Sequence, residues 1–297
     1  MEGVRNLLIG IDSGRNDVIL RFHAALRALQ SETPSTSSSS GGGRNNTSSS
    51  REGGSAGTSS SYNSGSGASG SSSNSLMPAS VCPAELQVGL RPSQHTPALF
   101  GNQCEPWATR RAVLLLHMLL SPGMVGLEWG AGASTLWYLA RISKLVTVEH
   151  NAAWAAKVRS LLELGYGASA IEERWQLQVA PPQPPEVLTF SEAESYDRFK
   201  AYVDVAFLER NASRPRFDFI TIDGQARLAC FQRALWLLKS HGGVLMLNNA
   251  QRPALKEVHS LVPKRWLTFQ ESNPFAQTIV WVSCEAGLCG PREAAED

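Results

Sequence analysis

The stretch VGLEWGAGASTLWYLA, residues 125–140, begins as an apolar run and then turns through Gly130 and Gly132. The apolar run is typical of a buried β-strand, and the residues that follow the glycines have the spacing of a helix. Glycines at such a turn let a ligand lie against the main chain, because no side chain stands in the way. The stretch therefore predicts the first strand, loop and helix of an α/β domain that binds a ligand at this loop.

Further strands and helices alternate along the chain. Apolar runs predict strands at 125–129, 145–149, 175–179, 217–223 and 244–248, with a closing antiparallel pair in 265–270 and 277–283. One of the predicted helices starts at Asn151 as its cap and ends at Gly165, and the Pro-rich region 180–216 predicts a loop and one helix. Such alternation indicates βαβ units, a parallel sheet and right-handed crossovers.

Polar residues follow four of these strands at the point where each strand ends. The clusters are Glu128–Gly132, Glu149–His150, Asp223–Gly224 and Asn248–Asn249. Ligands of open α/β sheets bind at the carboxyl ends of the strands, beside the point where the strand order reverses. The sequence therefore predicts a binding site at this edge of the sheet.

The glycine turn narrows the choice of ligand. A dinucleotide loop has the pattern GxGxxG, but Thr135 stands here at the place of the third glycine. Glu149, 17 residues after Gly132, is placed to accept hydrogen bonds from both hydroxyls of a ribose. A nucleoside without phosphates, such as S-adenosyl-L-methionine, suits this arrangement, and the acidic Glu128 suits its cationic end.

Four segments resemble class I S-adenosylmethionine-dependent methyltransferases: LEWGAGASTLWYL, VTVEHNAAWAAKV, FDFITIDGQARLACFQRAL and GGVLMLNNAQR. They are most similar to the methyltransferase-like group that carries LEWGSGGST, SVEH and IDGRxR, and the resemblance covers about Cys104 to Ser283. It implies an α/β fold with a Rossmann-like, doubly wound, mostly parallel sheet of seven strands, of which the last is antiparallel.

The resemblance also implies roles for single residues. The cofactor loop would consist of Glu128, Gly130, Gly132, Ser134 and Thr135. Glu149 would hold the ribose and His150 would pack beside the adenine. Asp223 and Gly224 would also contact the cofactor, with Asp223 next to the reacting centre. Asp223 is the candidate general base; alternatively, it caps the helix that follows.

Two departures from related patterns bear on the acceptor. Metal-dependent O-methyltransferases carry an Asp-Asn pair where this chain has Asn248-Asn249, which we interpret as substrate-binding residues without a metal. The first Arg of IDGRxR is Gln225 here. Arg227 and Arg252 either bind a carboxylate or phosphate of the acceptor or are solvated surface residues.

Composition predicts four regions along the chain. They are an N-terminal helical segment at 1–30, a disordered Ser/Gly-rich linker at 31–79, the methyltransferase-like domain at 80–290 and a disordered tail at 291–297. The N-terminal segment shows a helix pattern at 16–30. This helix docks on the domain, binds a partner or frays.

Charge and cysteine content set the remaining expectations. The 27 basic and 26 acidic residues are well mixed, so nucleic acid is not predicted as a partner. We recognise no signal peptide or membrane span, which makes the cytoplasm the default location. The sequence does not indicate an oligomeric state. The five cysteines have no zinc spacing, and idle thiols in a reducing compartment are expected rather than disulfides.

The preferred function is O-methylation of a small-molecule or sugar-like acceptor with S-adenosylmethionine as cofactor. Two alternatives remain open. The first is a catalytically degenerate module that keeps the fold for binding or interaction, which Gln225 and Asn248 favour. The second is a nicotinamide-dependent oxidoreductase, against which the missing third glycine speaks.

Overall fold

The computed structural model describes residues 18–31, 104–184, 192–204 and 217–287. The predicted linker, apart from Ser31, and the predicted tail lie outside these ranges, as does the part of the predicted domain before residue 104. The second half of the helix expected in 180–216 also lies outside them, and its first half forms α7, Lys200–Asp204.

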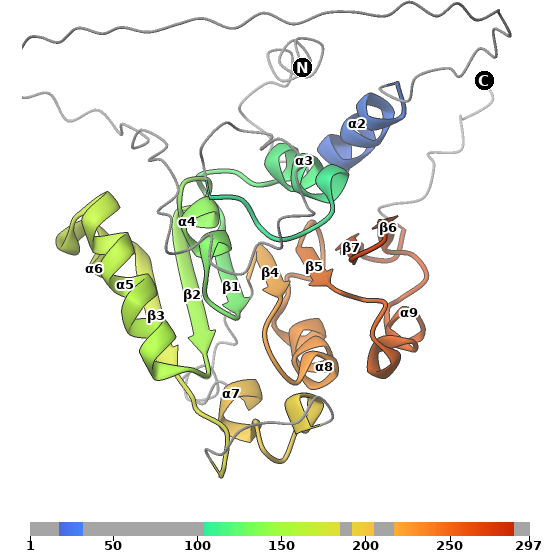
Figure 1. Ribbon diagram of the computed structural model, residues 1–297. Helices are drawn as coiled ribbons and strands as arrows, with labels where there is room; N and C mark the ends of the chain where they lie inside the picture. The colour runs from blue at the N-terminus through green and yellow to red at the C-terminus, as the bar shows by residue number, and fades with distance from the viewer. Residues whose placement is uncertain (1–17, 32–103, 185–191, 205–216, 288–297) are drawn as a thin grey trace, which may run out of the picture. The chain divides into compact units, whose positions relative to one another are not determined.

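The described residues form one sheet of seven strands (Figure 1). The strands are β1 Val125–Trp129, β2 Lys144–Glu149, β3 Trp175–Val179, β4 Phe219–Ile222, β5 Val244–Asn248, β6 Leu267–Ser272 and β7 Gln277–Val282. Their order is β3-β2-β1-β4-β5-β7-β6, and β7 runs antiparallel to both of its neighbours. The doubly wound sheet with an antiparallel last strand, which the sequence predicted, is confirmed.

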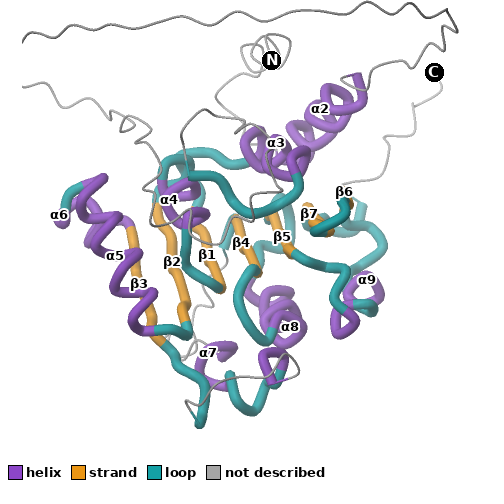
Figure 2. The backbone as a smooth tube through the Cα atoms, in the orientation of Figure 1, coloured by secondary structure: helices purple, strands orange, loops and turns teal. Residues whose placement is uncertain are grey.

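Alternate residues of each strand point to opposite faces of the sheet, and each face has its own apolar core. In β5, Val244 and Met246 pack into one core, while Leu245 and Leu247 pack into the other. The first core contains residues of α2 Val18–Ser31, α3 Arg110–Leu119, α4 Ala133–Leu139, α5 Ala152–Tyr166 and α6 Ala168–Arg174. The second contains residues of α7, α8 Arg227–Leu237 and α9 Val258–Leu261. The described residues thus form three layers, helix–sheet–helix (Figure 2).

The N-terminal helix packs on the domain. Its apolar residues Val18, Phe22, Ala25 and Leu29 are buried in the same core as α3. The carbonyl of Leu29 also accepts a hydrogen bond of 3.0 Å from Nη2 of Arg111. Of the alternatives left open for this helix, the structure shows docking.

Two sequence predictions need correction here. Helix α5 continues to Tyr166 because Gly167, not Gly165, has the left-handed φ of 83° that ends it. Cys104 and Cys284 are each part of a disulfide bond, so the expectation of idle thiols is wrong for both. The inference of a reducing compartment loses its support. Sequence spacing alone does not reveal which cysteines lie within bonding distance. Cys230 is a buried free thiol.

Neighbouring strands at the centre of the sheet bring the polar clusters together. Strands β2, β1, β4 and β5 are adjacent and parallel, so the four clusters at their carboxyl ends lie along one edge. The strand order reverses between β1 and β4, which is where ligands of such sheets bind. No helix among the described residues is long and apolar enough to cross a bilayer.

Candidate functional site

The two glycines of the loop after β1 have different surroundings. Gly130 has a φ of 101°, and a Cβ atom there would lie 2.9 Å from the Cα of Gly224. A Cβ on Gly132, by contrast, would have no atom within 4 Å. Gly130 therefore allows the loop after β1 to pack on the loop after β4, whereas Gly132 leaves its half-exposed backbone open to a ligand.

Helix α7 packs against the loop after β4 and the end of β1. A Cβ on Gly224 would lie 1.9 Å from the hydroxyl of the fully buried Tyr202, and Trp129 Nε1 donates a hydrogen bond of 3.0 Å to the Tyr202 carbonyl. His150 lies at the same place, with ring centroids 5.9 Å from Phe199 and 6.1 Å from Tyr202. No motif marks the region between 180 and 216, so Phe199 and Tyr202 could not be predicted from the sequence.

Glu128 lies beneath the loop rather than on its open side. Its carboxyl group is buried and accepts hydrogen bonds from the hydroxyls of Ser134 (2.6 Å), Thr135 (2.7 Å) and Thr147 (3.1 Å). Burial raises the pKa of Glu128 to about 8, although these hydroxyls oppose the shift. The three bonds tie the start of α4 to β1 and β2, and so fix the shape of the loop.

This pKa predicts how stability depends on pH. Between the ordinary pKa of 4.5 and about 8, the unfolded chain releases the Glu128 proton while the folded protein keeps it. The free energy of unfolding therefore falls as pH rises through this window, by at most about 1.4 kcal/mol per unit for this group. Urea unfolding at pH 5, 6.5 and 8 should show a smaller fall for Glu128→Gln than for the unaltered chain. Parallel curves would contradict a protonated Glu128.

Glu149 connects the end of β2 to the glycine loop. Its carboxylate accepts hydrogen bonds from the backbone N–H of Ala131 (2.9 Å) and of Asn151 (2.8 Å). His150 Nδ1 lies 2.8 Å from the same carboxylate. Asn151 caps α5 by accepting a hydrogen bond from the Trp154 N–H, as the sequence predicted. The acid predicted to hold a ribose is thus buried directly beside the half-exposed loop.

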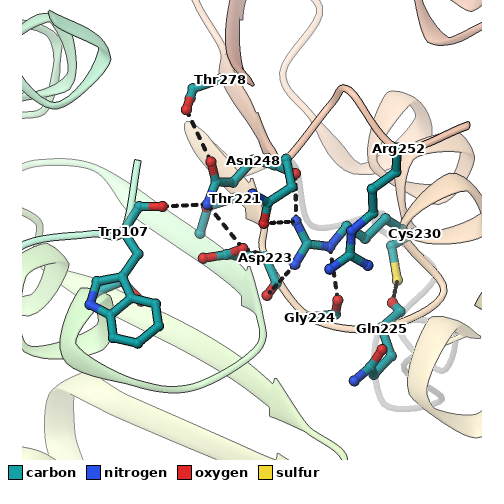
Figure 3. A network of polar contacts seen from close by, with 12 residues as sticks. Trp107, Thr221, Asp223, Gly224, Gln225, Cys230, Asn248, Arg252 and Thr278 are labelled. Carbon is teal, nitrogen blue, oxygen red and sulfur yellow. Dashed lines mark hydrogen bonds and ion pairs between the residues drawn. The ribbon is translucent and has the colours of Figure 1, made fainter. Parts of the chain in front are cut away.

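Asp223 lies at the end of β4 and keeps one oxygen open. Its Oδ1 is 3.0 Å from Nη2 of Arg227 and accepts a hydrogen bond of 3.2 Å from Nδ2 of Asn248 (Figure 3). Its Oδ2 has no hydrogen bond to any described residue, and 26% of the side chain is exposed. Burial of the group raises the pKa of Asp223, and Arg227 opposes the shift. A carboxylate of this kind can accept a proton from a bound molecule.

Asn248 acts as a connector between three segments. Its Nδ2 donates to the carbonyl of Trp107 and to Asp223, and its Oδ1 accepts a hydrogen bond of 3.0 Å from Thr278 (Figure 3). The side chain is buried. An Asp at this position would lack both donors and would place a second carboxylate against Asp223. The asparagine that departs from the metal-dependent pattern is therefore required by its surroundings.

Arg227 is buried and is used within the protein. Its guanidinium donates to the carbonyls of Gly224, Asn248 and Asp223, to Oδ1 of Asn249 at 3.1 Å, and to the Asp223 carboxylate. The structure thus contradicts the solvated alternative for Arg227. These five contacts correspond to its five N–H groups, which leaves none for an acceptor.

Arg252 also has a partner in the protein, since its Nη1 donates a hydrogen bond of 2.8 Å to Glu194. The other oxygen of Glu194 accepts a hydrogen bond of 2.9 Å from the backbone N–H of Arg227. Glu194, which no sequence motif marks, therefore joins both arginines. Within the described ranges, no group of three His, Cys, Asp or Glu side chains is placed to hold a metal ion.

Comparisons with known proteins find similarity among solved structures. No protein-family model and no curated protein matches the chain. Among solved structures, the chain is similar to a methyltransferase-like protein from Silicibacter pomeroyi, with a TM-score of 0.42, 17% identity, and coverage of 62% of this chain and 94% of that one. It is also similar to a T. thermophilus 16S rRNA N2 G1207 methyltransferase in complex with AdoMet and guanosine. There the TM-score is 0.36 and the identity 17%, over 55% and 38% of the two chains.

A third similar structure is an rRNA methylase from Streptococcus thermophilus, with a TM-score of 0.37, 11% identity, and coverage of 57% and 93%. The prediction that nucleic acid is excluded as a partner is wrong, because two of these structures are named as methyltransferases of rRNA. That prediction rested on the balanced net charge of the whole chain, which does not describe the charge around a single site.

Proposed function

We propose that the chain is an S-adenosylmethionine-dependent methyltransferase. The observation that carries this proposal is the contact between Glu149 and the glycine loop. A buried carboxylate at the end of β2 accepts the Ala131 N–H, directly beside the open backbone of Gly132. A candidate acid for the ribose hydroxyls and a glycine loop for the amino-acid part would thus lie together where the strand order reverses.

The residues present fit such a cofactor. Glu149 would hold the ribose, the backbone from Gly130 to Ser134 would lie under the methionine part, and His150 with Phe199 would border the base. Glu128 would shape the loop through Ser134 and Thr135 rather than contact the cofactor. When bound, S-adenosylmethionine supplies a methyl group on a positively charged sulfur. Asp223 would lie near the acceptor. We also propose that the methyltransferase-like domain extends over 80–290.

Calorimetric titration of the full chain with S-adenosylmethionine tests the proposal. We expect saturable binding in the micromolar range, about −8 kcal/mol, together with binding of the demethylated product S-adenosylhomocysteine. The oxidised and reduced nicotinamide dinucleotides serve as controls and are expected not to bind. A folded protein that binds neither sulfur nucleoside would overturn the proposal.

A catalytically degenerate binding module is the second candidate. The observation that favours it is the hydrogen-bond network around Asp223. In this network Arg227 and Asn248 donate to groups of the protein itself. The open Oδ2 of Asp223 argues for an enzyme instead. Cofactor binding without formation of S-adenosylhomocysteine on any acceptor would support the module.

A further inference from the structure

A short segment before α3 crosses the edge of the sheet next to Asp223. This segment, Cys104–Thr109, is called the strap here. Cys104 is disulfide-bonded and buried, and Thr109 donates its backbone N–H to Thr278 Oγ1 at 3.0 Å. Between these two points, the carbonyl of Trp107 accepts a hydrogen bond from the buried amide of Asn248. The backbone of the strap is therefore held by two hydrogen bonds, and Cys104 is buried in the core at its start.

The strap exposes its largest side chain. Cys104, Pro106 and Thr109 are buried, yet 47% of Trp107 is exposed to solvent. An exposed indole normally needs no explanation, but here the backbone that carries it is fixed by a buried polar network. Figure 3 shows the indole on the side of this network to which the second oxygen of Asp223 points. The indole and the open carboxylate oxygen thus face the same side of the network.

The charges around Asp223 decide what kind of molecule fits there. Arg227 contacts the carboxylate, and Arg252 lies close enough to act on its pKa, while Glu194 pairs with Arg252. Two guanidinium groups therefore balance two carboxylates. A cationic acceptor would gain little from a carboxylate that is already neutralised, and it would approach two positive charges. A neutral ring can stack on the indole at no such cost.

We infer that Trp107 and Asp223 together bind the methyl acceptor, and that the acceptor is a neutral ring that carries a hydroxyl group. This inference rests on the proposed function. The ring stacks on Trp107, and its hydroxyl donates to Oδ2 of Asp223. In the reaction, the acceptor oxygen bonds to the methyl carbon as the carbon–sulfur bond breaks. The electron pair of that bond remains on sulfur, and the hydroxyl proton passes to Asp223.

The test measures binding of small probes to the full chain saturated with S-adenosylhomocysteine, by ligand-observed NMR. The probes are methyl glucoside, phenol and uridine, which present a hydroxylated ring from three sources, and phenethylamine as a cationic ring. We expect at least one neutral probe to bind, and Trp107→Ala to weaken its binding tenfold or more. Trp107→Phe, which keeps a flat ring, is expected to restore most of the affinity. Trp236→Ala, an exposed tryptophan on α8, is the matched control and should leave it unchanged.

Calorimetry with S-adenosylmethionine separates this inference from the proposed function. Loss of probe binding in Trp107→Ala with unchanged cofactor affinity supports the inference, and it also shows that the variant is folded. If the cofactor binds but no neutral probe does, or if phenethylamine binds in preference, the inference is overturned and the proposed function stands. Equal binding of the neutral probe by Trp107→Ala and Trp236→Ala overturns it as well.

Discussion

Replacing Glu149 by glutamine is expected to lower the affinity for S-adenosylmethionine by roughly 100-fold or more. The carboxylate accepts the N–H groups of Ala131 and Asn151 on two oxygens, while glutamine offers only one acceptor. Its amide group would face one of these donors and leave it unpaired in a buried position, which costs about 1–3 kcal/mol. The charge-assisted hydrogen bonds proposed to the ribose would weaken in addition. Calorimetric titration of the full chain measures the loss directly.

The control for Glu149 is Glu172→Gln, because Glu172 lies exposed on α6, away from the loop. Since Glu149 also fixes the glycine loop, thermal unfolding is followed for each variant. Glu149→Asp keeps the charge but shortens the reach, and we expect an affinity between those of the unaltered chain and Glu149→Gln. A folded Glu149→Gln protein that binds as tightly as the Glu172→Gln control would refute the ribose assignment and with it the observation on which the proposed function rests.

Local patterns predicted the fold and the position of the site. The central strands β1 and β5 are short apolar runs that end at polar or glycine residues, and both could be predicted to the residue. The edge strand β3, WQLQV, alternates between polar and apolar residues and could also be predicted to the residue. The clusters Glu149–His150 and Asp223–Gly224 then lie together because parallel strands end on the same edge. The position of a strand and of the polar residues after it depends on residues close together in the chain, so both can be predicted from the sequence.

Contacts between distant segments could not be predicted in this way. The loop after β4 packs against Gly130 through Gly224. The space beside Gly130, which the sequence suggested for a ligand, is therefore filled by the protein itself. Trp107 and Asn248 are 141 residues apart, and no spacing rule connects a strap before α3 with the end of β5. The burial of Arg227 also follows from the loops that surround it, since a basic residue at the start of a helix is typically exposed.

The same distant contacts give Arg227 the largest expected effect on stability. Arg227→Met should lower the free energy of unfolding by about 3–5 kcal/mol, because it leaves the Asp223 carboxylate and three carbonyls without their partner. Arg227→Lys keeps the charge but provides three donors in place of five, so an intermediate loss is expected. Urea unfolding followed by circular dichroism measures these changes.

Arg233→Gln on the same helix is the matched control for Arg227. Arg233 forms an ion pair of 2.7 Å with Asp204, but a third of its side chain is exposed, so its loss should cost no more than about 1 kcal/mol. If Arg227→Met costs as little as this control, the guanidinium is not needed by the fold and remains free to bind an acceptor carboxylate or phosphate. If it costs several times more, Arg227 holds Asp223 and the loops after β4 and β5 in place. The acceptor must then be recognised by other residues, and the exposed Trp107 is the candidate that we propose.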